Sequence, residues 1–361
     1  MDRLTVLVTS VGTPIAHGVL KGLKELNKSI TIIGVESRAV TAGNKFCDRV
    51  YQVPRFLQDE EGYFNQLNEI IEKESVDALF SCHPPEIYLY EEYKERLSIP
   101  FSLPTSPHFS RLRNKEESYK WLIEEGMEKF VPTYYSFDTN EELLQIKKEF
   151  LPNEQHLIVK EVEGYGATGF ALLTNREQFL EAVNKQQTRI YDINDYVEAT
   201  QNSRRMVMKQ LEKPEYSVDT YVHDGEMVIA VPRNRSGVSS GLVIEGSVVK
   251  QEELIAISKD IVELFVEDGF INLQFMKEDG QFKLTDINPR FCGSHVMSLG
   301  AGVNFPELFL SYNLTDDRPI PEPIWNTRMY RYRDSFFYYG SSDSEKRMEN
   351  TGAEIFLLNT H

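Results

Sequence analysis

Residues 269–294, GFINLQFMKEDGQFKLTDINPRFCGS, decide the fold of this chain. Apolar and polar residues alternate over 272–276, and an apolar run continues over 282–287. The acidic turn Glu278-Asp279-Gly280, which ends in glycine, separates the two runs. Such a pattern on both sides of a short turn predicts a β-hairpin.

The predicted hairpin gathers polar side chains on one surface. Residues two apart in a strand share a face, so Asp286 and Asn288 point the same way, and Asn272 and Gln274 form a matching pair on the first strand. Their oxygen atoms suit a hard cation such as Mg²⁺. Arg290, which follows at once, suits a phosphate or a carboxylate. The hairpin by itself leaves a metal-bound phosphate site and a solvated polar face equally open.

Length and composition bound the class of protein. The 361 residues suffice for two or three domains. The net charge of −17 offers no basic field to a nucleic-acid backbone, so we expect no nucleic-acid partner. The cysteines, Cys47, Cys82 and Cys292, form neither a metal-ligand pattern nor a disulfide framework, which favours a reduced, cytoplasmic setting. No apolar run approaches a membrane span and the N-terminus lacks a signal-peptide pattern, so we expect no membrane partner.

The N-terminal part alternates between strand and helix patterns. This order predicts a doubly wound α/β domain with a parallel sheet, with strands at 4–8, 30–35 and 78–80 and helices at 16–26 and 63–73. No dinucleotide is expected there, because Gly12 and Gly18 are too far apart for the fingerprint. His83 follows a strand at its carboxyl end, where such folds bind ligands, so it either touches a substrate or only shapes the loop.

Prolines and small polar residues over 99–109 predict a domain boundary. Periodicity and turn signals predict the elements that follow. These are helices at 111–125, 141–150 and 255–267, and strands at 131–135, 157–160, 206–211, 215–222 and 227–231.

Three glycines after the predicted strand 157–160 form a G-x-G-x-x-G pattern, at Gly164, Gly166 and Gly169. A dinucleotide site requires a helix directly afterwards, but the next residues, 170–173, favour a strand. Glycines in a strand–loop–strand turn are typical of a flap whose N–H groups face phosphates, with Lys160 in reach of them. A plain flexible hairpin turn is the alternative.

Two basic segments leave their roles open. Arg233 and Arg235 precede a glycine-rich loop at 236–241, where they either bind an acidic substrate or are solvated. Residues 328–333, RMYRYR, either close an acceptor pocket or form an edge strand.

In order, these motifs resemble those of the ATP-grasp superfamily, and within it the carbamoyl-phosphate-synthase-like group. The resemblance covers nearly the whole chain and rests on four ordered motifs. They are Asn114-Lys115, Val159-Lys160 with the glycine loop, Lys209-Gln-Leu211 followed by Glu215, and Asn272-x-Gln274 with Asp286-x-Asn-Pro-Arg290.

The resemblance implies roles for individual residues. The nucleotide phosphates would be held by Lys115, Lys160 and a flap of Gly164, Gly166, Ala167, Thr168 and Gly169. The hinge beside adenine and ribose would be Lys209, Gln210, Leu211 and Glu215. One or two Mg²⁺ ions, with Mn²⁺ as an alternative, would be bound by Gln274, Asp286 and Asn288. The catalytic residues would be Arg290 and Lys160, and substrate would contact Asn272, Arg233, Arg235 and His83.

Four positions depart from the common pattern of the family. Asp286 stands where many members carry glutamate, and Gln274 is neutral where other branches have a carboxylate. Met208 replaces a hinge glutamate, so adenine recognition would rest on backbone, and Glu161 replaces the proline after the flap lysine. Fewer charges at the metal site imply that a second ion depends more on ATP itself.

The implied architecture is α/β, with a doubly wound N-terminal domain followed by a two-part ATP-grasp clamp. Its expected parts are an N-terminal domain at 1–105, an ATP-grasp domain at 106–325 with a flap subdomain at about 128–206 and a catalytic subdomain at about 207–325, and an extension at 326–361 packed on the ATP-grasp domain.

The implied activity is that of an ATP- and Mg²⁺-dependent carboxylate–amine ligase, which forms an amide through an acyl phosphate and releases ADP and phosphate. Its partners would be a small carboxylate and an amine, one of them an amino acid, and a second copy in a homodimer. One alternative is a carbamoyl-phosphate-synthase-like subunit that uses bicarbonate, although the chain has one clamp and that synthesis needs two phosphorylations. The other is a nucleotide-binding regulator without turnover.

Overall fold

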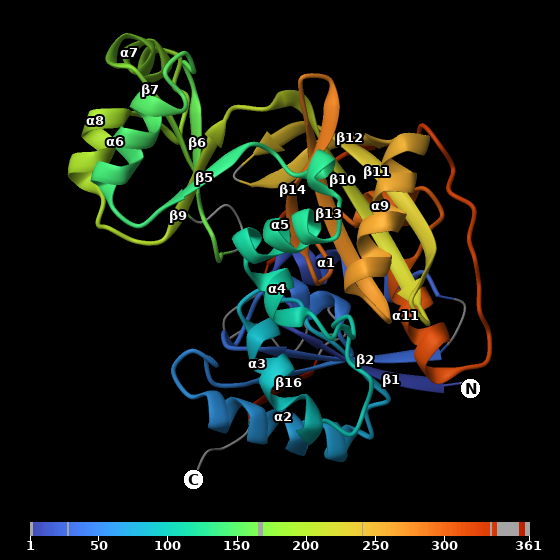
Figure 1. The fold of residues 1–361 in the computed structure, drawn as a ribbon. Coiled ribbons are helices and arrows are strands. Elements are labelled where there is room, and N and C mark those ends of the chain that lie inside the picture. The colour runs from blue at the N-terminus through green and yellow to red at the C-terminus, as the bar shows by residue number, and fades with distance from the viewer. Residues whose placement is uncertain are drawn as a thin grey trace. The chain divides into compact units, whose positions relative to one another are not determined.

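The computed structural model describes residues 3–26, 29–164, 169–239, 241–332, 334–337 and 354–357. The chain forms two compact units (Figure 1). The larger unit comprises residues 1–107, 217–272 and 288–361, and the smaller one comprises 108–216 and 273–287. Among the described residues, no helix is both long and apolar enough to cross a membrane.

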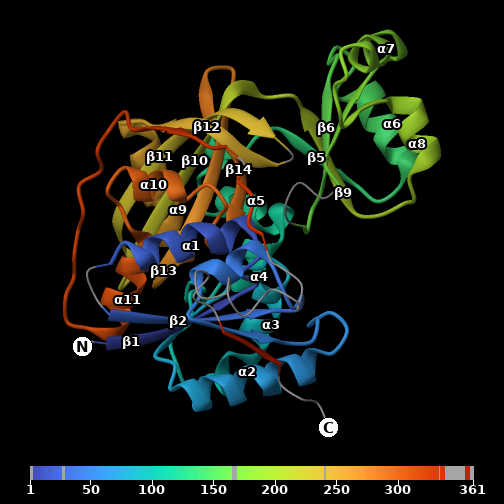
Figure 2. The ribbon, with the colours of Figure 1, turned by 180° about the vertical axis from the view of Figure 1, so that it is seen from behind.

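The larger unit begins with a parallel sheet whose strand order is β16-β3-β2-β1-β4. Helices α1 and α2 cover its opposite faces (Figures 1 and 2), so the predicted doubly wound fold is confirmed. The strands are β1 (Arg3–Thr9), β2 (Ser29–Glu36), β3 (Arg49–Gln52), β4 (Ala78–Phe80) and β16 (Glu354–Leu357). The helices are α1 (Pro14–Lys24), α2 (Glu60–Glu74) and α3 (Glu86–Tyr93), with short 3₁₀ turns η1 (Ala42–Phe46) and η2 (Lys94–Arg96).

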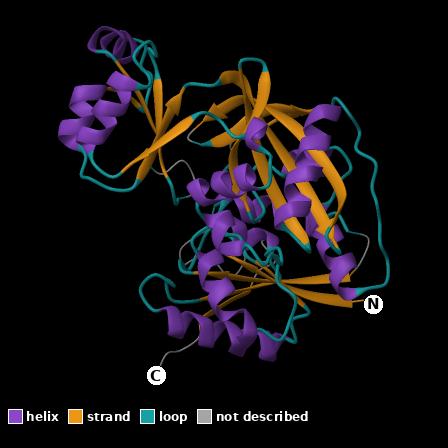
Figure 3. Cartoon of the chain, viewed as in Figure 1, coloured by secondary structure: helices purple, strands orange, loops and turns teal. Residues whose placement is uncertain are grey.

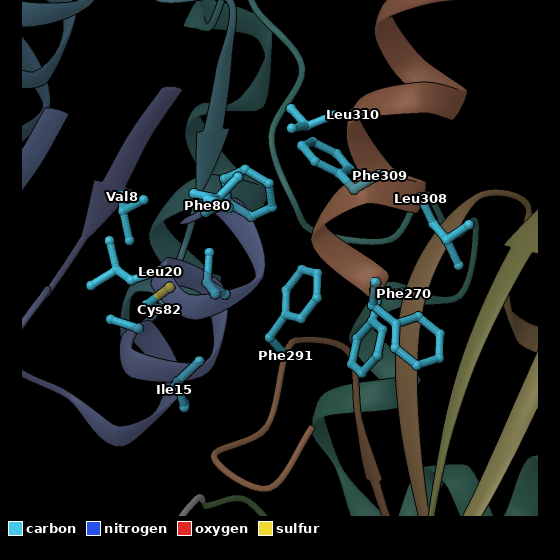
Figure 4. Close-up of a cluster of buried hydrophobic side chains, with 14 of the residues drawn as sticks. Val8, Ile15, Leu20, Phe80, Cys82, Phe270, Phe291, Leu308, Phe309 and Leu310 are labelled. Carbon is cyan, nitrogen blue, oxygen red and sulfur yellow. The ribbon is translucent and has the colours of Figure 1, made fainter. Parts of the chain in front are cut away.

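Burial on both faces explains the apolar sequence of these strands. Val6, Leu7 and Val8 of β1 are fully buried. The same core includes aromatic residues from distant parts of the chain (Figure 4). Phe270 stacks on Phe291 at a centroid distance of 4.4 Å. This core therefore joins separate chain segments of the larger unit.

A six-stranded sheet has the order β14-β13-β10-β11-β12-β15. Strands β10, β13 and β14 run through the boundary between the two units. The strands are β10 (Glu212–His223), β11 (Glu226–Ser239), β12 (Leu242–Val248), β13 (Gly269–Glu278), β14 (Gln281–Asn288) and β15 (Arg328–Tyr330). Helices α9 (Glu252–Phe265), α10 (Val296–Gly300) and α11 (Phe305–Leu314) belong to the larger unit.

The smaller unit has a five-stranded sheet with the order β5-β9-β6-β7-β8, and helices α6, α7 and α8 lie to one side of it (Figure 3). The strands are β5 (Tyr134–Phe137), β6 (Leu157–Glu161), β7 (Ala171–Thr174), β8 (Ile190–Asp192) and β9 (Arg205–Lys209). The helices are α4 (Phe109–Arg113), α5 (Lys115–Glu124), η3 (Glu128–Phe130), α6 (Asn140–Glu149), α7 (Arg176–Asn184) and α8 (Ile193–Ala199).

The hairpin expected from residues 269–294 is confirmed as β13 and β14. Its two turn residues, Asp279 and Gly280, have φ angles of 51° and 79°. A two-residue turn with both φ angles positive favours Asp-Gly and matches the twist of the paired strands. The turn chemistry therefore fixes the register that brings the polar residues of β14 to one face.

Three predictions about elements are wrong. The helix expected at 111–125 is two helices, because Asn114 leaves the helical conformation and caps α5 with its side chain. The loop expected after Arg235 continues β11 to Ser239, where it pairs with β12. The third concerns the extension expected to pack on the ATP-grasp domain, because its strand β16 pairs with β3 of the N-terminal sheet. The edge-strand alternative for residues 328–333 is confirmed, since β15 lies beside β12.

Candidate functional site

Two lysines in the smaller unit are placed by adjoining elements. Lys160 lies near the end of β6, and Lys115 is the first residue of α5. The N–H of Lys115 donates to the carbonyl of Val162 at 2.9 Å, and Asn114 donates from Nδ2 to Glu163 Oε1 at 3.2 Å. These bonds fasten the start of α5 to the segment that leaves β6.

Both lysines interact electrostatically with the carboxylate of Asp286. Lys115 Nζ lies 3.3 Å from Asp286 Oδ1 on β14, and Lys160 Nζ donates to the Thr285 carbonyl at 3.4 Å. Burial lowers the pKa of Lys160, the Asp286 charge opposes this, and Lys115 adds to it. The two ammonium groups lie among the charges of Asp286 and Glu215, and they are the groups of this cluster that could pair with a polyphosphate.

Helix α5 is held by a charge-assisted pair of hydrogen bonds. Arg204 Nε and Nη2 donate to the Glu116 carboxylate at 3.0 Å and 2.7 Å, and Nη1 donates to Asp138 at 2.8 Å. Burial raises the pKa of Glu116, but the hydrogen bonds from Arg204 and Lys120 outweigh it and the pKa is lowered. A bidentate guanidinium fixes orientation as well as distance, so it positions Lys115 at the start of the same helix.

The glycine loop joins β6 to β7, an antiparallel pair, as a phosphate flap requires. Gly169 has a φ of +69°, and a Cβ there would meet Glu161 Cγ at 2.3 Å. Glu161 is itself fixed by Arg205 Nε at 2.9 Å. Gly164 has a φ of 155°. The predicted flap residues Gly166, Ala167 and Thr168 lie outside the described residues.

The predicted hinge lies between β9 and β10. Lys209 Nζ pairs with Glu278 at 3.4 Å and Asp279 at 3.2 Å, so its side chain anchors the β13–β14 turn. The N–H of Gln210 donates to the His156 carbonyl at 3.2 Å, which means that this hinge donor, expected to face adenine, is already used. Leu211 is buried, and the charge of Glu215 on β10 acts on Lys160.

The predicted metal ligands include only one carboxylate. Gln274 lies on β13, and Asp286 and Asn288 lie on β14. Amide oxygens with one carboxylate fit Mg²⁺ when phosphate oxygens complete its shell, because Mg²⁺ is commonly bound by one or two carboxylates together with substrate phosphates. Elsewhere in the described chain, a grouping of three metal-capable side chains occurs at His223, Asp224 and Asp268.

Arg290 belongs to the larger unit and is oriented by its neighbours. Its Nη2 donates to Asn288 Oδ1 at 2.9 Å, and its Nη1 donates to the Phe291 carbonyl at 3.0 Å. Held at two points, its guanidinium has little freedom.

Two of the expected substrate residues are committed elsewhere. Arg233 is fully buried and pairs with the fully buried Asp219. Its Nη1 also donates to the Ser294 carbonyl at 2.6 Å. Asn272 is buried and donates to Ser217 Oγ at 2.8 Å and to Asp219 Oδ1 at 2.9 Å. Arg233 and Asn272 both serve an internal polar network, and their expected contact with substrate stays a prediction. Arg235 lies on β11 opposite Gly246 and stays a prediction.

His83 lines a cavity of about 340 Å³ in the larger unit, at the carboxyl ends of β1, β2 and β4. Sequence reasoning did not single out two acidic residues of this cavity, Glu36 and Glu86. The sequence does contain a signal for Glu36, because an acidic residue directly at the end of a parallel strand indicates a ligand-binding position. Glu86 had none, because its partners Thr9 and Ser10 are more than 70 positions away.

Comparisons with known proteins agree with this arrangement. Residues 201–333 match the family model described as ATP-grasp in the biosynthetic pathway with Ter operon. Residues 6–100 match the PylC-like N-terminal domain. No curated protein matches the sequence.

Several solved structures share the fold at low sequence identity. An L-amino acid ligase from Bacillus licheniformis has a TM-score of 0.62 and 17% identity, over 93% of this chain and 82% of that one. N5-carboxyaminoimidazole synthetase from Staphylococcus aureus has a TM-score of 0.63 and 13% identity, over 89% and 80%. The biotin carboxylase domain of 2-oxoglutarate carboxylase from Hydrogenobacter thermophilus has a TM-score of 0.62 and 17% identity, over 90% and 72%.

The larger unit thus has a doubly wound domain, and the smaller unit has Lys160 on β6 just before the segment that leads to the antiparallel strand β7. An ATP-grasp family model thus matches residues 201–333, and the model of another N-terminal domain matches residues 6–100 before it.

Proposed function

We propose that the protein is an ATP- and Mg²⁺-dependent ligase that joins a small carboxylate to an amine, one of them an amino acid. The observation that supports this best is the pair Lys115 and Lys160 beside Asp286, next to a glycine loop between antiparallel strands. Two ammonium groups beside a glycine-rich segment suit polyphosphate binding, although the chain as a whole is acidic.

In the proposed reaction, the substrate carboxylate attacks the γ-phosphate, which gives an acyl phosphate and ADP. The amine then attacks the acyl carbon, the C–N bond forms, and phosphate leaves. Lys115 and Lys160 neutralise charge on the phosphates, and Arg290, held by Asn288, stabilises the transferred phosphoryl group. Mg²⁺ supplies further charge neutralisation when bound, with Gln274, Asp286 and Asn288 as its protein ligands, for one ion or two. The flap excludes water that would hydrolyse the acyl phosphate.

The setting of the reaction is also part of the proposal. We place the protein in the cytoplasm, in keeping with three buried cysteines that form no disulfide. We propose a homodimer, because a structural neighbour is described as a biotin carboxylase domain dimer. That neighbour is described in complex with MgADP and bicarbonate, and another with ATP.

The experiment that tests the function measures ADP and phosphate release with Mg-ATP across a matrix of amino acids and small acids, bicarbonate included. Release that needs one acid and one amine, together with a product of their combined mass less water, supports the ligase and names its substrates. Release stimulated by bicarbonate alone favours carbamoyl-phosphate-type chemistry. Tight ATP binding without stimulated release by any pair contradicts turnover and favours a regulator.

Arg290 provides the sharpest variant for this reaction. We expect Arg290→Ala to lower turnover at least a hundredfold while ATP binds as in the wild type, because a group that stabilises developing charge is worth about 3–4 kcal/mol. Arg290→Lys keeps the charge and loses the fork that contacts Asn288 and Phe291, so we expect partial activity. Turnover assays with calorimetric titration of an ATP analogue separate the two effects, and full activity of Arg290→Ala contradicts the role.

A further inference from the structure

A second polar site lies within the larger unit, whereas Lys115, Lys160 and the glycine loop belong to the smaller unit. It is the cavity of about 340 Å³ at the carboxyl ends of β1, β2 and β4. A doubly wound sheet binds ligands at this edge, and the volume suits a small molecule. Its lining includes the polar and charged residues Ser10, Glu36, Arg38, Arg55, His83 and Glu86.

Glu86 is a buried acid without a permanent cation partner among the described residues. It is 3% exposed, and it accepts hydrogen bonds from Thr9 Oγ1 at 2.6 Å and Ser10 Oγ at 2.8 Å. Both donors are neutral hydroxyls. Burial raises the pKa of Glu86 to about 7, against these hydrogen bonds. A buried carboxylate in such a place gains most from a cation that a ligand brings.

His83 leaves a second polar atom beside Glu86. Its Nδ1 is buried without a hydrogen-bond partner among the described groups and lies 3.9 Å from Glu86 Oε1. Burial lowers the pKa of His83, so the ring is predominantly neutral at pH 7 and does not neutralise Glu86. An unused buried donor or acceptor costs free energy until a ligand or a water satisfies it.

The cavity also excludes an anionic nucleotide. Glu36, 6% exposed, accepts hydrogen bonds from the N–H groups of Gly12 and Ser37, both at 3.0 Å. Those N–H groups follow the first two strands, where a phosphate would need free donors. With Glu86, the cavity thus has two buried acids, which repel phosphate.

Positive charge is confined to the rim of the cavity. Arg55 is exposed, and Arg38 is 59% exposed with only a long contact of 3.5 Å to Glu36. A molecule that places an ammonium group on Glu86 and an anionic group toward these arginines satisfies both ends.

We propose that this cavity binds the amine substrate of the ligation and that the substrate is a free amino acid, with its ammonium group on Glu86 and its carboxylate at Arg38 and Arg55. That the bound amino acid is a substrate rests on the proposed function, whereas its binding in the cavity does not. Arg290 connects the cavity to that chemistry, because its charge acts on His83 within the same unit.

The test is calorimetric titration of the full chain, without ATP, with the twenty amino acids. Each amino acid that binds is compared with its N-acetyl derivative, which lacks the ammonium group, and with its amide, which lacks the carboxylate. We expect binding to fall at least tenfold when either group is masked. Equal binding of the N-acetyl derivative overturns the proposal, as does a panel in which nothing binds.

Glu86→Gln keeps the shape and the hydrogen-bond acceptor and removes the charge, so we expect at least tenfold weaker amino-acid binding. Glu91→Gln is the matched control, because Glu91 lies on the same helix α3 and pairs with Lys94 at 3.0 Å. Arg55→Gln provides a second variant, and because Arg55 is exposed we expect this substitution to leave folding unchanged. We expect Arg55→Gln to weaken the binding of amino acids but not the binding of their amides, which lack the carboxylate.

The two proposals fail in different ways. If ligation occurs but Glu86→Gln leaves both binding and the KM for the amine unchanged, the cavity proposal is wrong and the ligase stands. If amino acids bind through Glu86 but no acid stimulates ADP release, the binding site stands and the ligase does not.

Discussion

Lys160 illustrates how a residue proposed to bind phosphate can oppose stability. Burial lowers the pKa of its ammonium group, so the unliganded protein does not gain from the charge. We expect Lys160→Met to weaken binding of Mg-AMP-PNP at least tenfold, about 1.4 kcal/mol, and to leave the melting temperature unchanged or higher. Isothermal titration and scanning calorimetry measure the two quantities.

Lys185→Met is the control for this change. Lys185 lies in the same unit, directly after α7, is 65% exposed, and pairs with the exposed Glu181 of that helix at 3.4 Å. We expect it to alter neither nucleotide binding nor stability by a measurable amount. Wild-type nucleotide affinity in Lys160→Met contradicts its place at the phosphates.

Glu86 makes a different prediction, for the pH dependence of stability. Its pKa rises from an ordinary 4.5 to about 7 on folding, so the folded state binds the proton more tightly. The stability that this proton contributes is fully present below about pH 4.5 and is lost as the pH rises through 7. At 1.36 kcal/mol per unit, the wild type should lose up to about 3 kcal/mol relative to Glu86→Gln over this range.

Urea denaturation at pH 5 and pH 7.5 measures this difference in the free energy of unfolding. Subtracting Glu86→Gln from the wild type removes the titrations that both proteins share. If the free energy of unfolding of the wild type minus that of Glu86→Gln is the same at both pH values, Glu86 does not take up a proton on folding. If this difference is larger at pH 7.5 than at pH 5, folding lowers the pKa of Glu86 instead of raising it.

At the scale of elements, the turn from β6 to β7 depends on one backbone conformation. Gly169 occupies the left-handed region at φ +69°, which costs a residue with a Cβ about 1–2 kcal/mol. A Cβ there also displaces Glu161, which Arg205 holds. We expect Gly169→Ala to lower the melting temperature and to weaken binding of Mg-AMP-PNP severalfold, as measured by calorimetry.

Gly225→Ala separates the two causes. Gly225 has a φ of +76°, and a Cβ there meets nothing within 4 Å. It therefore carries the conformational cost without the displaced side chain, and we expect nucleotide binding to be unaffected. If Gly169→Ala and Gly225→Ala bind the nucleotide equally well, the displacement of Glu161 does not affect nucleotide binding and the prediction for Gly169 is wrong.

Elements with a strong local signal were predictable. The hairpin of β13 and β14 follows from alternation around Asp279-Gly280, a turn whose positive φ angles these residues tolerate. The break between α4 and α5 was missed because the helical periodicity continues across it. A local signal was present, since Asn114 with Glu117 three residues later resembles a helix start.

The candidate site was predictable only where one segment carries it. Lys160 follows from its glycine loop, whereas Arg233, in an equally basic and glycine-rich context, is buried. What distinguishes them is Asp219, which faces Arg233 from another strand and has no local signature. Glu86 is likewise defined by hydroxyl groups of Thr9 and Ser10 that only the fold brings to it.

At the scale of the whole molecule, the larger unit is assembled from three separate stretches of chain. Its apolar core joins them, and so does a buried polar network around Asp219. Asp219 accepts from Arg233, from Asn272 at 2.9 Å and from Ser298 Oγ at 2.7 Å. Arg233 in turn donates to the carbonyl of Ser294, in the segment that follows Arg290. Folding of the larger unit and placement of that segment are therefore coupled.

This coupling predicts that Arg233→Ala lowers the free energy of unfolding of the larger unit by about 3–5 kcal/mol, since it leaves a fully buried carboxylate without its cation. Arg176→Ala, which removes an exposed pair with Asp195, should cost the smaller unit no more than about 1 kcal/mol. The two tryptophans let each unit be followed separately, because Trp121 belongs to the smaller unit and Trp325 to the larger. Urea titrations read from Trp325 in a Trp121→Phe background, and from Trp121 in a Trp325→Phe background, assign each loss to its unit. If Arg233→Ala shifts the Trp325 transition no more than Arg176→Ala shifts that of Trp121, the buried pair does not hold the three segments together.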